Sequence, residues 1–493
     1  MKLQIVLFSI FCSLVLTRLA YADEANCALR TAKTIHYVTD HEDLVWPGIQ
    51  INKTPILIHF RNSEHIYAYN FTPKNAKWQK VTLDNKPAYY LDSDYDEISN
   101  VEVGFKEVDG QNSYVYKFFD YNDENDILFC LRALLSKRFA YYLATHSAFP
   151  HHTFAHWKHN YIGFNQIRNA QYLFLEDRIL QDYIETHDAE TLKNYLATYQ
   201  YRRSLLSKES AEFESASEIR FEASSYFSFR SLNMDDKTYT EQILRNYAKR
   251  LECPAYSDRA QIIFCLTFGH YNLGGPVLGF ALDKIAGKGW QAKAENSASS
   301  FADLLGTYFT MMPEEASERV KKSEKRYDFS DIKSQLKVSL EPYLEAMAEQ
   351  EKNYSKAPGI VVNIDNRYCR LHAFTRKPRK NYVVTSKINL ITELDEEMKC
   401  SLDDGNVSIV YKKIPWVYQY NSVLVNEIKL PVDTSITIND KKQSLGEAVS
   451  ADQTISFTKL KIESPQAIIT IEGNGTYAVK NGVVFIDWPI DKS

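Results

Sequence analysis

The histidines of this sequence are concentrated in one short segment. Five of the twelve fall within 14 residues, and two frames there place ligand positions four residues apart. On a helix such positions share a face and could hold a zinc ion together. One frame joins His146 to Pro150, and the other joins His152 to His156. The five clustered residues are His146, His151, His152, His156 and His159.

The two frames differ in what a helix tolerates. Pro150 would remove a backbone donor from a helix interior, so an intact helix favours the later pair as ligands, with His146 as an alternative first ligand. A zinc peptidase also needs a glutamate directly after the first histidine, to take a proton from the metal-bound water. Ser147 or Thr153 stands there instead. A histidine-rich helix or loop without metal is the other interpretation.

Two glutamates further along the chain could take part in the same chemistry. Glu218 and Glu222 lie one helical turn apart. Glu222 could complete a ligand set with His152 and His156, and the two carboxylates could act as acid and base if their environments separate their pKa values. The alternative is a solvated glutamate pair bridged to nearby arginines, which is common on helix surfaces. These arginines are Arg202, Arg203 and Arg220.

The chain divides into three regions with different patterns of apolar residues, and these regions position the candidate residues. The central segment repeats apolar residues every three or four positions, which predicts helices. The flanking segments carry short β-branched and aromatic runs separated by turn residues, which predict strands, and the last region has the spacing of an antiparallel sandwich. We therefore expect an α+β protein with a signal peptide (1–22), an N-terminal β-rich domain (23–125), a mainly helical domain (126–351) and a C-terminal β-sandwich-like domain (357–493).

The first 22 residues have the features of a secretory signal peptide. They begin with Lys2, continue through a short apolar core and end in Ala20-Tyr21-Ala22. The apolar run is shorter than the roughly 20 residues that span a bilayer, and no later stretch is long enough. We expect cleavage after Ala22, a secreted or periplasmic protein, and no membrane span after cleavage. An uncleaved anchor is the alternative.

Six cysteines follow the predicted cleavage point, two in each third of the chain. In an exported protein their even number suggests disulfides, although six thiols allow 15 pairings. Their placement favours local bridges within successive regions. We expect Cys27–Cys130, Cys253–Cys265 and Cys369–Cys400.

The overall composition excludes several classes of protein. With 493 residues, 44% hydrophobic and 25% charged, the chain has the material for several globular domains. Its net charge of −5 does not suit a dedicated nucleic-acid binder. We expect no nucleic-acid partner.

The order of these motifs resembles a family of exported bacterial proteins related to gluzincin-type zinc metallopeptidases. That family has a WPG-containing segment, an HExxH helix, an arginine-containing helix pair, an E-x-x-x-E-G-x-A-x-Y helix and a glycine-rich helix ending in LD before a G-W pair. The resemblance spans residues 40–310. Its matching positions are Trp46-Pro47-Gly48, the histidine cluster, Tyr201-Arg202-Arg203, Glu218, Glu222-Ala223, Tyr226, Gly279, Leu282-Asp283 and Gly289-Trp290.

The departures from the family decide the expected function. Both frames of the histidine segment lack the glutamate base, and Glu222 is followed by Ala223 instead of glycine. Loss of a general base costs a factor of about 10²–10⁴ in rate. The resemblance therefore implies a degenerate, non-hydrolytic relative that binds a peptide or cell-envelope component, with zinc retained or lost.

Two other functions are compatible with the same residues. An active zinc hydrolase could use a different base, with Glu218 or Glu222 as catalytic residues or His159 in that role. Alternatively, the C-terminal β domain could be a non-catalytic surface-binding module with the helices as its scaffold.

Overall fold

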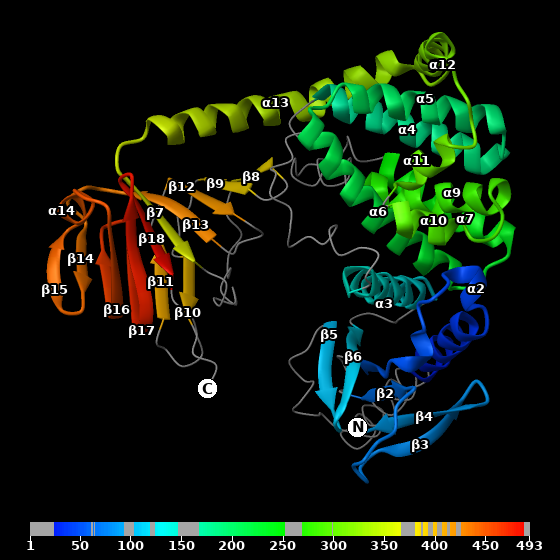
Figure 1. Ribbon diagram of the computed structural model, residues 1–493, viewed down its shortest axis with the longest axis horizontal. Helices are drawn as coiled ribbons and strands as arrows, with labels where there is room; N and C mark the ends of the chain where they lie inside the picture. The colour runs from blue at the N-terminus through cyan, green and yellow to red at the C-terminus, as the bar shows by residue number, and fades with distance from the viewer. Residues whose placement is uncertain are drawn as a thin grey trace, which may run out of the picture.

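The computed structural model places an N-terminal sheet, a group of helices and a C-terminal sheet in chain order, and the long helix α13 leads from the helices to the C-terminal sheet (Figure 1). The mixed α and β character predicted from the sequence is confirmed. The structure describes residues 24–60, 63, 65–92, 103–118, 124–145, 167–251, 269–297, 299–365, 380–385, 388–392, 398–401, 407–411, 415–420 and 425–487.

The N-terminal region begins with a helix that the sequence analysis missed. Residues 24–40 are helical and are followed by the short helix α2 (Glu42–Val45) and the 3-10 turn η1 (Ile51–Lys53). The helical pattern is readable in the sequence, because five residues recur at helical spacing and are all buried. They are Cys27, Ala28, Thr31, Ile35 and Val38. The β-branched and aromatic runs later in this region instead favoured the prediction of a β-rich domain.

Six strands follow and form one sheet in the order β3-β4-β2-β1-β6-β5. Most neighbours are antiparallel, but β1 and β6 are parallel, with Ile58 opposite Tyr116. The Asp109-Gly110 turn joins β5 to β6, and both residues have positive φ, as a tight hairpin requires. The strands are β1 (Ile56–Phe60), β2 (Ile66–Tyr69), β3 (Gln79–Leu83), β4 (Lys86–Leu91), β5 (Val103–Val108) and β6 (Gln111–Phe118).

The central region is helical, as predicted. The long helical pattern after residue 170 is divided at His187, which has a φ of +54°, and the Asp188 side chain caps the next helix by accepting from the Glu190 and Thr191 N–H groups. None of the described helices is long and apolar enough to cross a membrane. The helices are α3 (Glu124–Thr145), α4 (Ile167–Thr186), α5 (Ala189–Ser204), α6 (Lys208–Arg230), α7 (Asp236–Leu251), α9 (His270–Ile285), α10 (Trp290–Ser297), α11 (Phe301–Gly306), α12 (Pro313–Arg326) and α13 (Phe329–Lys356).

Helix α9 contains a proline in its interior. The helix begins at His270, and Pro276 lies inside it. A proline in a helix interior leaves the carbonyl four residues earlier without its N–H donor. That carbonyl belongs to Asn272, and the Ser225 hydroxyl on α6 donates a hydrogen bond to it. Contact with a neighbouring helix thus compensates for the proline.

The C-terminal region is rich in antiparallel strands, as expected. Its twelve described strands form one connected sheet in place of two separate ones, and the sheet forks at β17. One edge of β17 pairs with β16, while the other edge pairs first with β11 and then with β18. The strands are β7 (Ile360–Asp365), β8 (Lys380–Thr385), β9 (Ile388–Thr392), β10 (Met398–Ser401), β11 (Val407–Tyr411), β12 (Trp416–Tyr420), β13 (Val425–Leu430), β14 (Ser435–Ile438), β15 (Lys441–Ser444), β16 (Gln453–Glu463), β17 (Ala467–Lys480) and β18 (Val483–Asp487), with the short helix α14 (Leu445–Ala448) between β15 and β16.

Helix α13 is joined to this sheet by polar contacts at its C-terminal end. The Lys429 ammonium donates to the carbonyls of Tyr354 and Ala357 at 2.8 and 2.9 Å. A cation at a helix C-terminus is favourable because the last carbonyls lack intrahelical donors. The Trp416 indole donates to Gln350 at 2.9 Å, which adds a second attachment.

Candidate functional site

The residues predicted to do chemistry are only partly within the described chain. His146, His152, His156 and the rest of that histidine cluster lie outside the described residues, so the predicted zinc ligand set stays a prediction. Within the described part of the chain, no three His, Cys, Asp or Glu side chains converge on a point suited to a metal ion. Glu218 and Glu222 are described, and both lie on α6.

Glu222 faces the interior and is bound to the backbone. Its side chain is buried, and its Oε2 accepts a hydrogen bond from the Phe301 N–H at 2.9 Å, at the start of α11. Burial, reinforced by the neighbouring Glu218 carboxylate, raises the pKa of Glu222 well above its usual value. This carboxyl group is therefore held in an environment that favours its neutral form.

Glu218 is buried one turn earlier but has ionic partners. Its Oε2 accepts from the Tyr199 hydroxyl at 2.9 Å and from the Arg203 guanidinium at 3.0 Å. Burial raises the pKa of Glu218 in spite of the opposing effect of Arg203. Arg203 was among the expected partners, but the solvated glutamate pair considered as an alternative is not found, because both glutamates are buried.

Arg202 is the centre of the largest group of buried charges. It is fully buried and donates to Glu176 at 2.7 Å, to Glu214 at 2.6 Å and to the Asn169 side chain at 3.1 Å. Burial alone would lower the pKa of Arg202, but Glu176 and Glu214 outweigh it and hold the pKa above its usual value. This arginine links α5 to both α4 and α6.

His270 extends the same group to a fourth helix and was missed by the sequence analysis. At the start of α9, its Nδ1 lies 2.7 Å from Asp177 and its Nε2 lies 3.3 Å from Glu176. Burial lowers the pKa of His270, but the two carboxylates outweigh this and raise it to about 9. The imidazole is thus positively charged at neutral pH. We call Arg202, His270, Glu176, Asp177, Glu214 and Glu218 the charge network.

Two glycines allow α9 to approach α6 closely beside this network. A Cβ at Gly275 would lie 2.3 Å from the Glu222 carbonyl oxygen, and one at Gly279 would lie 2.1 Å from the Tyr226 ring. Such distances are incompatible with any larger side chain unless the helices move apart. The spacing Gly275-x-x-x-Gly279 places both glycines on one face of the helix. This pattern was a readable sign of close helix contact.

A second cluster gathers most of the aromatic residues on which the family resemblance rests. The Trp290 indole and the Tyr226 hydroxyl both donate to Asp283 at 3.0 Å. The buried Trp46 ring lies 5.9 Å from Trp290, edge to face, and its indole donates to Glu295 at 2.5 Å. Residues far apart in the sequence thus form one packed unit that attaches the N-terminal region to α6, α9 and α10.

Of the six cysteines in the predicted disulfides, the structure describes the side chains of two. Cys27 and Cys130 are both buried in the same core, on the N-terminal helix and on α3. Burial raises the pKa of the Cys27 thiol, and Cys130 adds to this effect. The pairing Cys27–Cys130 stays a prediction. Cys253, Cys265 and Cys369 lie outside the described residues, and for Cys400 the structure describes only its position in β10.

The described geometry favours stabilisation over turnover. Carboxylates that are buried and bound to arginine, tyrosine or backbone donors hold helices together, and a buried general base bound in this way has little freedom to accept a substrate proton. Comparison with family models, with curated proteins and with solved structures finds no significant match to this chain.

Proposed function

We propose that this protein is an exported, gluzincin-like protein that does not hydrolyse substrates and instead binds a peptide or a cell-envelope component. The proposal rests on one observation: both glutamates of the motif are bound by other groups of the protein. Glu218 is bound by Tyr199 and Arg203, and Glu222 is bound by the Phe301 N–H group.

The sequence and the packing support the proposal from two further directions. The position after the first histidine of either frame holds Ser147 or Thr153 in place of the glutamate base. In addition, Trp46, Tyr226 and Trp290 pack as one unit, as expected of a scaffold that keeps its packing while its catalytic residues have changed. A scaffold of this kind can keep a binding surface after hydrolysis is lost.

The decisive experiment measures zinc content and hydrolysis together. We expect purified full-length protein to show no chelator-sensitive peptidase or esterase activity. A Thr153→Glu variant rebuilds an HExxH sequence, so chelator-sensitive hydrolysis gained by it would show that only the base is missing. Ser147→Glu rebuilds only the frame that lacks the second histidine and is the matched control.

One outcome would contradict this proposal, and a second would refine it. Chelator-sensitive hydrolysis by the unmodified protein would support the alternative of an active enzyme with another base. In that case Glu218→Gln and Glu222→Gln would identify which carboxylate serves. Zinc that is stoichiometric in the unmodified protein and is lost in a His152→Ala, Glu222→Ala double variant would instead support a retained metal site in a non-hydrolytic protein.

A cavity at the end of α13 favours the C-terminal β domain as a second candidate for binding. It has a volume of about 360 Å³ and is lined by Tyr354, Trp416 and Pro358, with the exposed Val432 at one side. Aromatic and proline side chains of this kind commonly form ligand sites. In the full chain, Trp416→Ala should weaken retention on envelope polysaccharide if this cavity is the site, whereas Lys441→Ala, an exposed change on β15, should not.

A further inference from the structure

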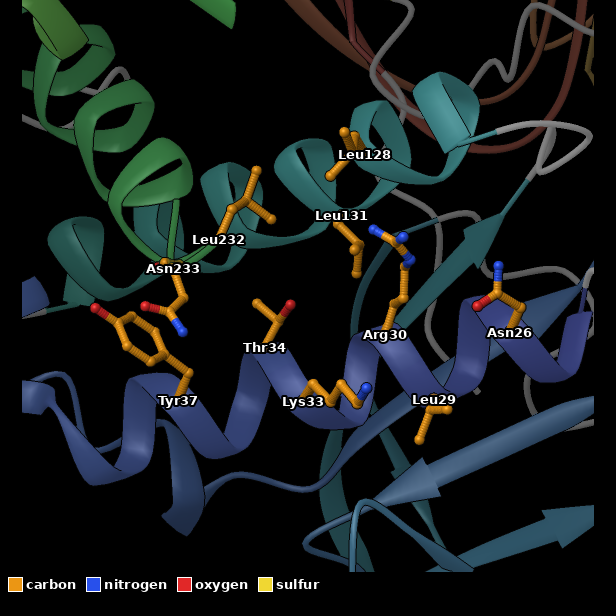
Figure 2. A pocket seen from close by; sticks show the side chains of 11 residues that line it. Asn26, Leu29, Arg30, Lys33, Thr34, Tyr37, Leu128, Leu131, Leu232 and Asn233 are labelled. Atoms are coloured by element: carbon orange, nitrogen blue, oxygen red, sulfur yellow. The ribbon is translucent and has the colours of Figure 1, made fainter. Parts of the chain in front are cut away.

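A second cavity lies between the N-terminal helix and α3, away from the charge network. Figure 2 shows the helix of residues 24–40 along one side, α3 along the other, and the turn after α6 closing one end. Its volume is about 400 Å³, within the roughly 300–1,000 Å³ typical of small-molecule sites. No residue of this cavity belongs to the motifs discussed above.

The charged groups among the described lining residues of this cavity are all cations. Eleven described residues line it, and the charged ones are Arg30 and Lys33. Polar neutral groups from Asn26, Thr34 and Asn233 also line it. Since the chain as a whole carries a net charge of −5, this pair of cations is a local feature. Such a lining favours an anionic group.

The opposite wall is aliphatic and continues into a neighbouring cavity. Leu128 and Leu131 of α3 and Leu232 after α6 form this wall, as Figure 2 shows. Leu128 and Leu232 also line an adjacent cavity of about 500 Å³, whose described lining includes Phe129 and Arg132 and no carboxylate. The Phe129 side chain is 69% exposed, so apolar surface extends beyond the first cavity.

We propose that this cavity binds a free amphiphile with an anionic head group and an aliphatic chain. The head group lies between Arg30 and Lys33, and the chain follows Leu128 and Leu232 toward the adjacent cavity. All described lining residues lie on helices or on the turn after α6, so this part of the chain offers the cavity side chains and no strand edge for a peptide backbone. This distinguishes the ligand from an extended peptide.

The test is calorimetric titration of the full-length protein with a matched set of probes. Octanoate, octylammonium and 1-octanol share one chain and differ in charge, while acetate has the head group without the chain. We expect octanoate to bind at least about tenfold more tightly than each of the others, because both charge and apolar contact contribute. Added salt should weaken octanoate binding.

Variants locate the site. Lys33 is exposed, so Lys33→Gln should fold normally and weaken octanoate binding severalfold, and adding Arg30→Gln should bring the loss to about tenfold or more. Lys80→Gln, the same change on the exposed strand β3, should leave binding unchanged. If the double variant fails to fold, the single Lys33→Gln variant and the probe series still decide.

Four results would overturn the proposal. They are the absence of octanoate binding, equal binding of octylammonium, octanoate affinity unaffected by Lys33→Gln with Arg30→Gln, and preferential binding of an acetylated glutamate–leucine peptide. If octanoate does not bind and phosphatidylglycerol vesicles do, the first of these results assigns the cations to a membrane surface. Octanoate binding without vesicle binding supports a free amphiphile.

Discussion

The charge network of the helical region and the core of the C-terminal sheet are both buried, but the first is built from charged side chains and the second from apolar ones. The network joins four helices through Arg202, His270 and their buried carboxylates. The core of the C-terminal sheet consists of apolar side chains such as Ile364, Ile469 and Val484, all fully buried. Both regions exclude water, but only the first depends on exact pairing of charges.

This difference implies different responses to mutation. An apolar core loses roughly the transfer free energy of the atoms removed, plus a cavity cost. A buried ion pair contributes little net stability compared with a well-packed apolar replacement, but removing one partner leaves a charge that has neither water nor a counter-ion. The helical region should therefore be the more sensitive of the two to single substitutions.

The largest effect is expected from Arg202→Leu. This change leaves Glu176 and Glu214 buried without their shared cation, and should lower the free energy of unfolding by about 3–5 kcal/mol or prevent folding. Urea unfolding followed by circular dichroism measures it. The matched variant Arg203→Leu removes a partly exposed neighbour and should cost less. Equal losses would show that the network has no special centre.

His270→Gln should have a smaller but still clear effect. Glutamine can keep one hydrogen bond to Asp177 but cannot supply the positive charge, so we expect a loss of about 2–3 kcal/mol. His187→Gln, a change at the exposed junction between α4 and α5, is the control for loss of an imidazole. A His270→Gln variant as stable as the unmodified protein would mean that this histidine is not charged in the fold.

The pH dependence of stability tests the same charge by titrating His270 in the unmodified protein. The pKa of His270 is raised to about 9 from an ordinary value near 6.5. Its stabilising contribution is therefore complete below pH 6.5 and is lost as the pH rises through 9. The stability difference between the unmodified protein and His270→Gln should shrink over this interval by about 3 kcal/mol, because a shift of one pKa unit corresponds to about 1.4 kcal/mol. A constant difference would contradict a protonated imidazole.

The sequence predicted the helices better than it predicted their contacts. Local periodicity is sufficient to recognise α3 or α6, but it cannot show that the interior Pro276 is compensated by Ser225, 51 residues earlier in the chain. The N-terminal helix was missed although its apolar spacing was readable. Parallel pairing of β1 with β6 and the fork at β17 depend on long-range pairing, which strand patterns alone do not specify.

The contacts of the candidate site could likewise not be predicted from the spacing of its residues. Spacing on one helix brought Glu218 and Glu222 together correctly, but it could not reveal that Tyr199 and Arg203 bind the first or that the Phe301 N–H binds the second. His270 carries no local motif, and its importance follows only from the packing of α9 against α4. Burial and partner choice are tertiary properties, and they decide the charge of each group.

The smallest effect is expected from Ile469→Val in the C-terminal sheet. The side chain is fully buried, and losing one methylene group should cost about 0.5–1.5 kcal/mol with no change in the pH dependence of stability. Urea titrations at pH 6.5 and 9 measure both quantities. A cost above that of His270→Gln would reverse the proposed order of sensitivity, because it would make apolar packing in the sheet more demanding than charge pairing among the helices. A cost that varies with pH would show instead that packing at Ile469 is energetically coupled to groups that titrate in this range.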